Sequence, residues 1–229
     1  MVWSCLVSIL PGMAQTEKLT DYVNPFVGTD GYGNVYPGAQ IPFGGIQISP
    51  DTDSRFYDAA SGYKYNHLTL MGFSLTHLSG TGIPDLGDFL FIPGTGEMKL
   101  EPGTHEDPDQ GYRSRYSHDK EWASPNYYAV ELADYGVKAE MTSGVRSGMF
   151  RFTYPESDNA FIMIDMNHTL WQSCEWSNLR MINDSTITGY KLVKGWGPER
   201  HVYFTATFSK KLTGLRFVQD KKPVIYNTS

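Results

Sequence analysis

Alternating apolar and polar positions run through the second half of the chain and predict β-strands. Between His201 and Phe208 every second residue is apolar, which is the period-two pattern of a half-buried strand. Similar patterns predict strands at Tyr127 to Leu132, Val137 to Thr142, Met149 to Tyr154 and Phe161 to Met166. Turn residues separate these strands and their starts lie 10 to 12 residues apart, a spacing typical of an antiparallel sandwich.

The first half of the chain is less regular. Two further strands are predicted there, at Gly45 to Ile48 and Phe89 to Ile92, with long polar loops around them. The run from Phe161 to Ile164 is apolar on both faces, so we expect it inside a sandwich. Since a long helical periodicity is missing, the predicted fold is all-β and mainly antiparallel: a β-sandwich with long functional loops and few short helices.

Three polar segments interrupt the first half, at residues 28–39, 57–65 and 77–88. Each combines glycine with hydroxyl, amide, carboxylate or aromatic side chains. Glycine lets the backbone approach a ligand closely, rings offer apolar faces to a pyranose, and the polar groups match sugar hydroxyls. This composition suggests sugar binding, although the same residue types also build ordinary turns between strands.

Composition excludes several classes of function. With 229 residues the chain is long enough for one large all-β domain, and its net charge of −6 without a basic run argues against nucleic acid as a partner. No stretch reaches the length of a membrane span, and two cysteines cannot support a disulfide framework. Residues 1–15 form a partial signal-like segment without a basic start, so we expect export to the periplasm, cell surface or medium.

The obvious catalytic patterns are weak. Asp85 and Asp88 are separated by two residues in one loop, whereas an inverting pair of carboxylates stands roughly 6.5 to 9.5 Å apart around a water. These residues are better suited to binding sugar hydroxyls or bracing the loop. The histidines show no HExxH spacing. The sequence therefore predicts neither catalytic nor metal-ligating residues in this chain.

An ordered set of specific strings covers most of the chain. These strings are YVNPFVGT at residues 22–29, GYGNVYPGA at 31–39, PFGGIQISPDT at 42–52, SGY at 61–63, GFSLTHLSGTG at 72–82, DLGD at 85–88, RSG at 146–148 and GWG at 195–197. Together they resemble the N-terminal domain of glycoside hydrolase family 92, a family of exo-acting α-mannosidases. Several such strings in the right order make chance similarity very improbable.

The resemblance implies a β-sandwich docked on a larger (α/α)6 helical domain, with the active pocket at the seam. It further implies inverting, calcium-dependent hydrolysis of terminal α-mannosides, in which the acid, the base and most calcium ligands come from the helical domain. Residues 20–229 would then form the sandwich domain, ending before the catalytic domain, and would be inactive alone. The implied partners are mannose-containing glycans and the missing helical domain.

Sugar contacts are predicted within the three polar segments. The predicted residues are Gly31, Gly33, Asn34, Tyr57, Asp58, His77, Ser79, Gly80, Thr81, Asp85 and Asp88. Tyr57 stands where relatives commonly carry Trp, which leaves a smaller stacking face. His77, Ser79 and Thr81 can alternatively be hydrogen-bonding residues that pin the loop.

Two other functions stay open at this stage: a free-standing mannose-binding module, and a structural domain that supports the helical toroid. Three tryptophans, Trp171, Trp176 and Trp196, either line the seam with the other domain or fill the core.

Overall fold

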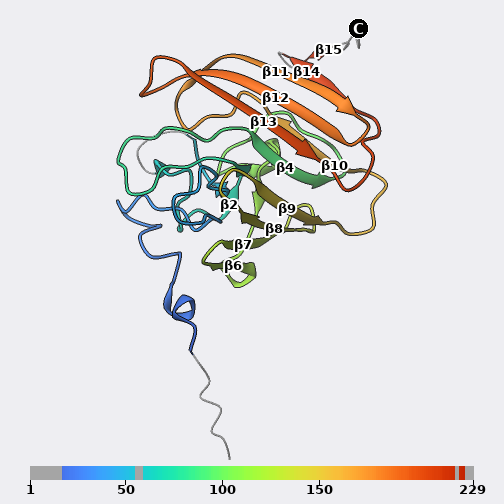
Figure 1. Cartoon of the computed structure of the whole chain (residues 1–229). Helices are drawn as coiled ribbons and strands as arrows, with labels where there is room; N and C mark the ends of the chain where they lie inside the picture. The colour runs from blue at the N-terminus through green and yellow to red at the C-terminus, as the bar shows by residue number, and fades with distance from the viewer. Residues whose placement is uncertain (1–16, 55–58, 220–221, 225–229) are drawn as a thin grey trace, which may run out of the picture.

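Strands form almost all of the regular structure (Figure 1). The computed structural model describes residues 17–54, 59–219 and 222–224, and every strand pair within them is antiparallel. Helical structure in the described part consists of short 3-10 turns, among them η1 (Leu19–Tyr22), η3 (Pro108–Gln110) and η4 (His118–Lys120). The predicted all-β, antiparallel fold is confirmed.

Three sheets make up the body. The central sheet has the order β1-β3-β4-β10, with β1 (Ser49–Asp51), β3 (Gly72–Ser74), β4 (Leu90–Thr95) and β10 (Ala160–Asp165). A second sheet is a meander of β6 (Glu121–Ser124), β7 (Tyr127–Leu132), β8 (Val137–Ser143) and β9 (Gly148–Thr153). The third contains β11 (Ser173–Asn183), β12 (Thr186–Lys194) and β13 (Arg200–Thr207).

Two small ribbons complete the described strands. One pairs β2 (Thr69–Leu70) with β5 (Ser114–Arg115), and the other pairs β14 (Phe217–Gln219) with β15 (Lys222–Val224). In Figure 1, β4 and β10 lie between the β11–β13 sheet and the β6–β9 sheet.

Aromatic side chains hold these layers together. Phe73 on β3 lies 6.5 Å from Phe150 and 6.3 Å from Phe152, both on β9, measured between ring centroids. Phe91 on β4 lies 5.2 Å from Phe150 on one side and 6.0 Å from Phe204 of β13 on the other. The ring of Phe91 therefore links β4 to both neighbouring sheets.

The structure confirms most of the predicted strands and corrects two details. Residues 45–47 are not in a strand: Ile48 forms an isolated bridge with Ala39, and β1 begins at Ser49. The predicted interior strand around Phe161 is β10, which lies at an edge of its sheet and has no fully buried residue. A strand that is apolar on both faces is therefore partly covered on both faces, but it need not lie in the middle of its sheet.

The hairpin of β11 and β12 was not predicted. Its outward positions are largely polar, and two irregularities in the pairing, at Cys174/Trp176 and Met181/Asn183, break the alternation along β11. The signal-like residues 1–15 lie outside the described residues. Among the described helices, none is long and apolar enough to cross a membrane.

Candidate functional site

The three polar segments meet at one surface. The backbone N–H of Gly80 donates to the carbonyl of Asn34 at 2.7 Å, which ties the segment 77–88 to the segment 28–39. Lys64 Nζ donates to the carbonyl of Gly31 at 2.8 Å, and the backbone N–H of Tyr65 donates to Thr29 at 2.9 Å. We call the surface formed by residues 28–39, 59–65 and 77–88 the glycine rim.

Several predicted sugar contacts lie exposed on this rim. Gly31, Ser79 and Gly80 are exposed, and the two glycines have positive φ angles of 60° and 75°. The N–H groups of Gly31 and Gly33 are used within the loop, since they donate to the side chain and the carbonyl of Asp30 at 2.8 and 3.3 Å. These glycines therefore offer a close approach to the backbone but do not offer unused amide donors.

Gly33 is fixed by packing. A Cβ atom at this position would lie 2.2 Å from the carbonyl oxygen of Gly28, so no other residue fits without moving the loop. The next residue, Asn34, is half-buried with φ of 51°, and its amide donates to the carbonyl of Tyr32 at 3.3 Å. The hydroxyl of Thr81 donates to the carbonyl of Ile83 at 3.2 Å, which braces the tip of the segment 77–88.

A hollow of about 350 Å³ opens beside the segment 28–39. It is lined by Asn24, Phe26, Val27, Gly28, Thr29, Asp30 and Tyr65. The ring of Tyr65 stacks on His118 at 3.9 Å with an interplanar angle of 4°, so its orientation is set before any ligand arrives. The hollow thus combines an oriented ring with polar loop groups, which is the composition of a sugar-binding surface.

His77 is buried beneath the rim. Its Nδ1 lies 2.6 Å from the carbonyl oxygen of Gln47, and its Nε2 lies 2.8 Å from Oδ1 of Asp51 and 3.0 Å from the hydroxyl of Ser74. Both ring nitrogens are therefore engaged inside the protein. This geometry favours the loop-pinning role for His77.

Asp51 is the centre of this buried network. It is fully buried, and its second oxygen, Oδ2, lies 2.8 Å from Nε2 of His168. Burial alone would raise the pKa of the Asp51 carboxyl, but the charge of His77 and the hydrogen bonds from both imidazoles outweigh it and hold this pKa well below its ordinary value. A Cβ on Gly62 would lie 2.2 Å from Oδ1, so glycine lets the middle segment close over the carboxylate.

Asp88 is held by two cations. Lys191 Nζ lies 3.0 Å from Oδ1, Arg200 binds Oδ2, and the hydroxyl of Thr76 donates to Oδ2 at 2.7 Å. Burial of Asp88 tends to raise the pKa of its carboxyl, but the charges of Lys191 and Arg200 lower it on balance. The carboxylate of Asp88 therefore stays charged and joins β12 and β13 to the segment 77–88.

Asp85 is fixed by backbone donors. Its Oδ1 accepts from the N–H of Leu86 at 2.6 Å, and its Oδ2 accepts from the N–H of Trp196 at 3.0 Å. Asp85 and Asp88 are only 6% and 1% exposed. Both carboxylates are thus engaged inside the protein. Their direct contact with sugar stays a prediction.

Two sets of predicted residues, Tyr57 with Asp58 and the three tryptophans, are not part of the rim described above. Tyr57 and Asp58 lie outside the described residues. The tryptophans do not fill the core, because Trp171, Trp176 and Trp196 are 60%, 55% and 55% exposed.

Sequence reasoning missed Asp51, His168, Lys191 and Arg200. Asp51 lies in the quoted string PFGGIQISPDT, and this polar residue beside an apolar run was the available signal. Nothing in the spacing connected Lys191 or Arg200 to Asp88, more than a hundred residues earlier.

The described side chains do not gather into a cluster of metal ligands. Within residues 17–54, 59–219 and 222–224, no three or more His, Cys, Asp or Glu side chains gather so that they could hold a metal ion. The two central carboxylates are instead paired with imidazoles or cations. We therefore assign no step to a calcium ion.

Comparison with known proteins gives a consistent picture. The chain matches the glycosyl hydrolase family 92 N-terminal domain over residues 22–229. A protein of Arthroderma benhamiae described as an uncharacterized secreted glycosidase is 30% identical over 139 residues, which are 60% of this chain and 17% of that protein.

Two solved structures are similar in fold and sequence. A family 92 glycosyl hydrolase named ccman5 is 29% identical with a TM-score of 0.67, covering 81% of this chain and 26% of its own. A family 92 inverting mannosidase from Bacteroides thetaiotaomicron is 25% identical with a TM-score of 0.64, covering 83% of this chain and 25% of its own. The chain thus spans about a quarter of the length of these two relatives.

Proposed function

This chain belongs to glycosyl hydrolase family 92 as an N-terminal domain of that family, and we propose that it supplies the sugar-binding wall of an exo-acting α-mannosidase. The convergence of three polar segments on the glycine rim carries this proposal. The likeness to an inverting mannosidase supports mannose as the sugar.

The rim suits the non-reducing end of a mannoside. Gly31 and Gly80 carry no side chain and are exposed, so a pyranose ring can approach the backbone closely. The exposed hydroxyl of Ser79 and the amide of Asn34 offer donors and acceptors to sugar hydroxyls. The oriented ring of Tyr65, beside the hollow, offers a stacking face.

Hydrolysis is assigned to groups outside this chain. Inverting hydrolysis needs one carboxyl group as acid and a second as base, on opposite sides of the scissile bond. Asp85 and Asp88 are buried and engaged with backbone N–H groups or cations. We therefore propose that the chain is inactive alone and acts with a helical domain that supplies the acid, the base and the ligands of calcium.

Export is the last part of the proposal. The likeness to the secreted glycosidase of Arthroderma benhamiae supports it. The apolar, signal-like residues 1–15 support it as well.

A hydrolysis assay and a binding assay on the recombinant chain test the proposal. We expect no release of nitrophenol from an aryl α-mannoside. In amide NMR, we expect mannose to shift the signals of Gly31, Ser79 and Gly80, and the Ser79→Ala variant to weaken this response. Ser124→Ala, an exposed serine on β6, is the matched control.

Hydrolysis by the chain alone would contradict the assignment of acid and base to another domain. Mannose-dependent shifts confined to the β6–β9 sheet would contradict the rim as the site. No shift even at high mannose concentration would reject the free-standing mannose-binding module and assign binding to the assembled enzyme.

A further inference from the structure

A cluster of rings covers the outer face of the β11–β13 sheet. Trp176, Tyr190 and Tyr203 come from β11, β12 and β13, with centroid distances of 5.1 Å from Trp176 to Tyr190 and 4.7 Å from Tyr190 to Tyr203. His201 of β13 stacks on Tyr190 at 5.9 Å. Tyr203 is 70% exposed and Trp176 is 55% exposed. We call these four residues the aromatic platform.

An irregularity in the strand pairing places Trp176 in the platform. Cys174 pairs with Val193, but Trp176 pairs with Leu192, so Glu175 is an extra residue in β11. In a regular ladder Trp176 would oppose Lys191, whose side chain is fully buried on the inner face. The bulge therefore turns the indole from the inner to the outer face. Bulges of this kind are common where a strand re-aims a functional side chain.

The rings are oriented without a ligand. The hydroxyl of Tyr190 lies 2.7 Å from Nδ1 of His201, and Nε2 of His201 lies 3.9 Å from a carboxylate oxygen of Glu199. Tyr190 is also packed between Trp176 and Tyr203. A surface whose side chains are already ordered loses less entropy when it binds.

Polar side chains border the rings on one side, and Leu192 lies between Trp176 and His201 on the other. Asn178 and Tyr203 pair with Tyr190 from its two sides, and the neighbouring row across the sheet is Arg180, Thr188 and Thr205. An apolar protein partner would leave the amide of Asn178 and the guanidinium of Arg180 without hydrogen bonds, which is costly. A sugar satisfies both kinds of group, because its C–H face packs on a ring and its hydroxyls bond at the edges.

We propose that the aromatic platform is a second carbohydrate-binding surface, which takes a neutral oligosaccharide across Trp176, Tyr190 and Tyr203. This inference stands apart from the proposed function, because no platform residue belongs to the glycine rim. The platform lies on the outer face of β12, since Tyr190 points outward whereas its neighbour Lys191 points inward to Asp88.

Affinity gel electrophoresis in gels containing soluble α-mannan tests the platform, with dextran as a second neutral glycan. We expect the chain to be retarded by at least one of them, and Tyr203→Ala and Trp176→Ala each to weaken retardation about ten-fold, the size of one lost ring contact. Trp176→Phe keeps a ring and should retain most of the binding.

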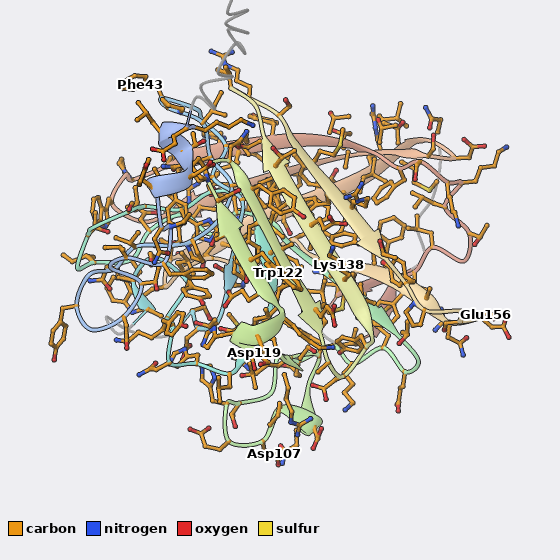
Figure 2. All side chains as sticks on the ribbon, turned by 90° about the horizontal axis from the view of Figure 1, so that it is seen from below. Phe43, Asp107, Asp119, Trp122, Lys138 and Glu156 are labelled. Carbon is orange, nitrogen blue, oxygen red and sulfur yellow. The ribbon has the colours of Figure 1, made fainter. Side chains whose placement is uncertain are left out.

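Trp122 provides a matched control. It is an exposed tryptophan, 45% accessible, on β6 of a different sheet, with Lys138 Nζ 5.6 Å from its ring centroid (Figure 2). Trp122→Ala should bind as the parent does. Unchanged folding of each variant is checked by its near-UV circular dichroism and urea midpoint.

Three results would overturn the inference. The first is that neither glycan retards the parent chain. The second is that the platform variants bind as well as the parent, and the third is that Trp122→Ala weakens binding as much as the platform variants do. Sedimentation of the parent as a dimer that Tyr203→Ala converts to a monomer, without glycan retardation, would assign the face to contact between copies of the chain.

Discussion

Replacing Asp51 with Asn tests the buried network below the glycine rim. The aspartate accepts from His77 and His168 at 2.8 Å each and is fully buried. Asparagine has the same shape but retains only one acceptor oxygen, so its NH₂ group must face one of the two imidazole donors. One charge-assisted hydrogen bond is lost, and the imidazole N–H that faces the new NH₂ group is left without an acceptor. Together these effects cost about 3 kcal/mol of the free energy of unfolding.

Urea denaturation followed by tryptophan fluorescence measures this cost. In a chain of 229 residues, 1 kcal/mol corresponds to about 2–4 °C in melting temperature, so Asp51→Asn should melt roughly 6–12 °C below the parent. Asp158→Asn, an exposed aspartate, is the control and should stay within about 0.5 kcal/mol. A loss below about 1 kcal/mol for Asp51→Asn would refute the argument that this carboxylate holds the two imidazoles.

Three further predictions concern pH and packing. First, burial and then the charge of His105 lower the pKa of His67 to about 4, so this ring stays neutral in the fold while the unfolded ring takes up a proton below about 6.5. The chain should lose about 1–2 kcal/mol between pH 6.5 and 4, and His67→Gln should remove that loss. Second, Lys191→Met removes a cation from buried Asp88 and should cost about 3–5 kcal/mol in urea unfolding. Third, Gly38→Ala should cost about 1–3 kcal/mol, because its Cβ would lie 2.0 Å from the carbonyl oxygen of Ile48.

Each of these predictions has a control on the surface. His201→Gln should keep the pH dependence of the parent, since His201 is exposed. Lys194→Met removes the exposed partner of Glu175 and should cost less than about 1 kcal/mol. Gly82→Ala should be nearly neutral, because a Cβ there meets nothing within 4 Å. A variant that behaves like its control would contradict the corresponding prediction.

The strands that could be predicted from the sequence are those with a regular alternation. Tyr127–Leu132 matches β7, and the predictions for β8, β9, β10 and β13 are within one residue at each end. Of these strands, β7, β8 and β9 pair with their neighbours in the chain within the β6–β9 meander, and β13 pairs with the preceding β12, so local patterns carry enough information there. The short strand β1, Ser49–Asp51, is fully buried although it contains no apolar aliphatic residue, and hydropathy cannot identify such a strand.

The candidate site could be predicted only in part, for a related reason. Glycine and polar residues marked the loops, and two of these loops contact each other directly through Gly80 and Asn34. The groups that fix the loops come from distant strands, as the pairing of Asp88 with Arg200 shows. Such pairs depend on how the sheets stack, and this stacking is not contained in the spacing of residues along a loop.

The support of the rim by buried charges has a consequence for its rigidity. Glycine-rich loops have few side chains with which to pack, so the position of the rim depends on what lies beneath it. Beneath it are two buried carboxylates, Asp51 and Asp88, each bonded to side chains from two distant parts of the chain. A buried ion pair adds little net stability compared with apolar residues of the same shape, but its geometry is specific. A volume-matched apolar replacement of the Asp88 and Lys191 pair can therefore preserve the fold while the segment 77–88 loses its fixed position. Sugar binding should then fall more than the free energy of unfolding does.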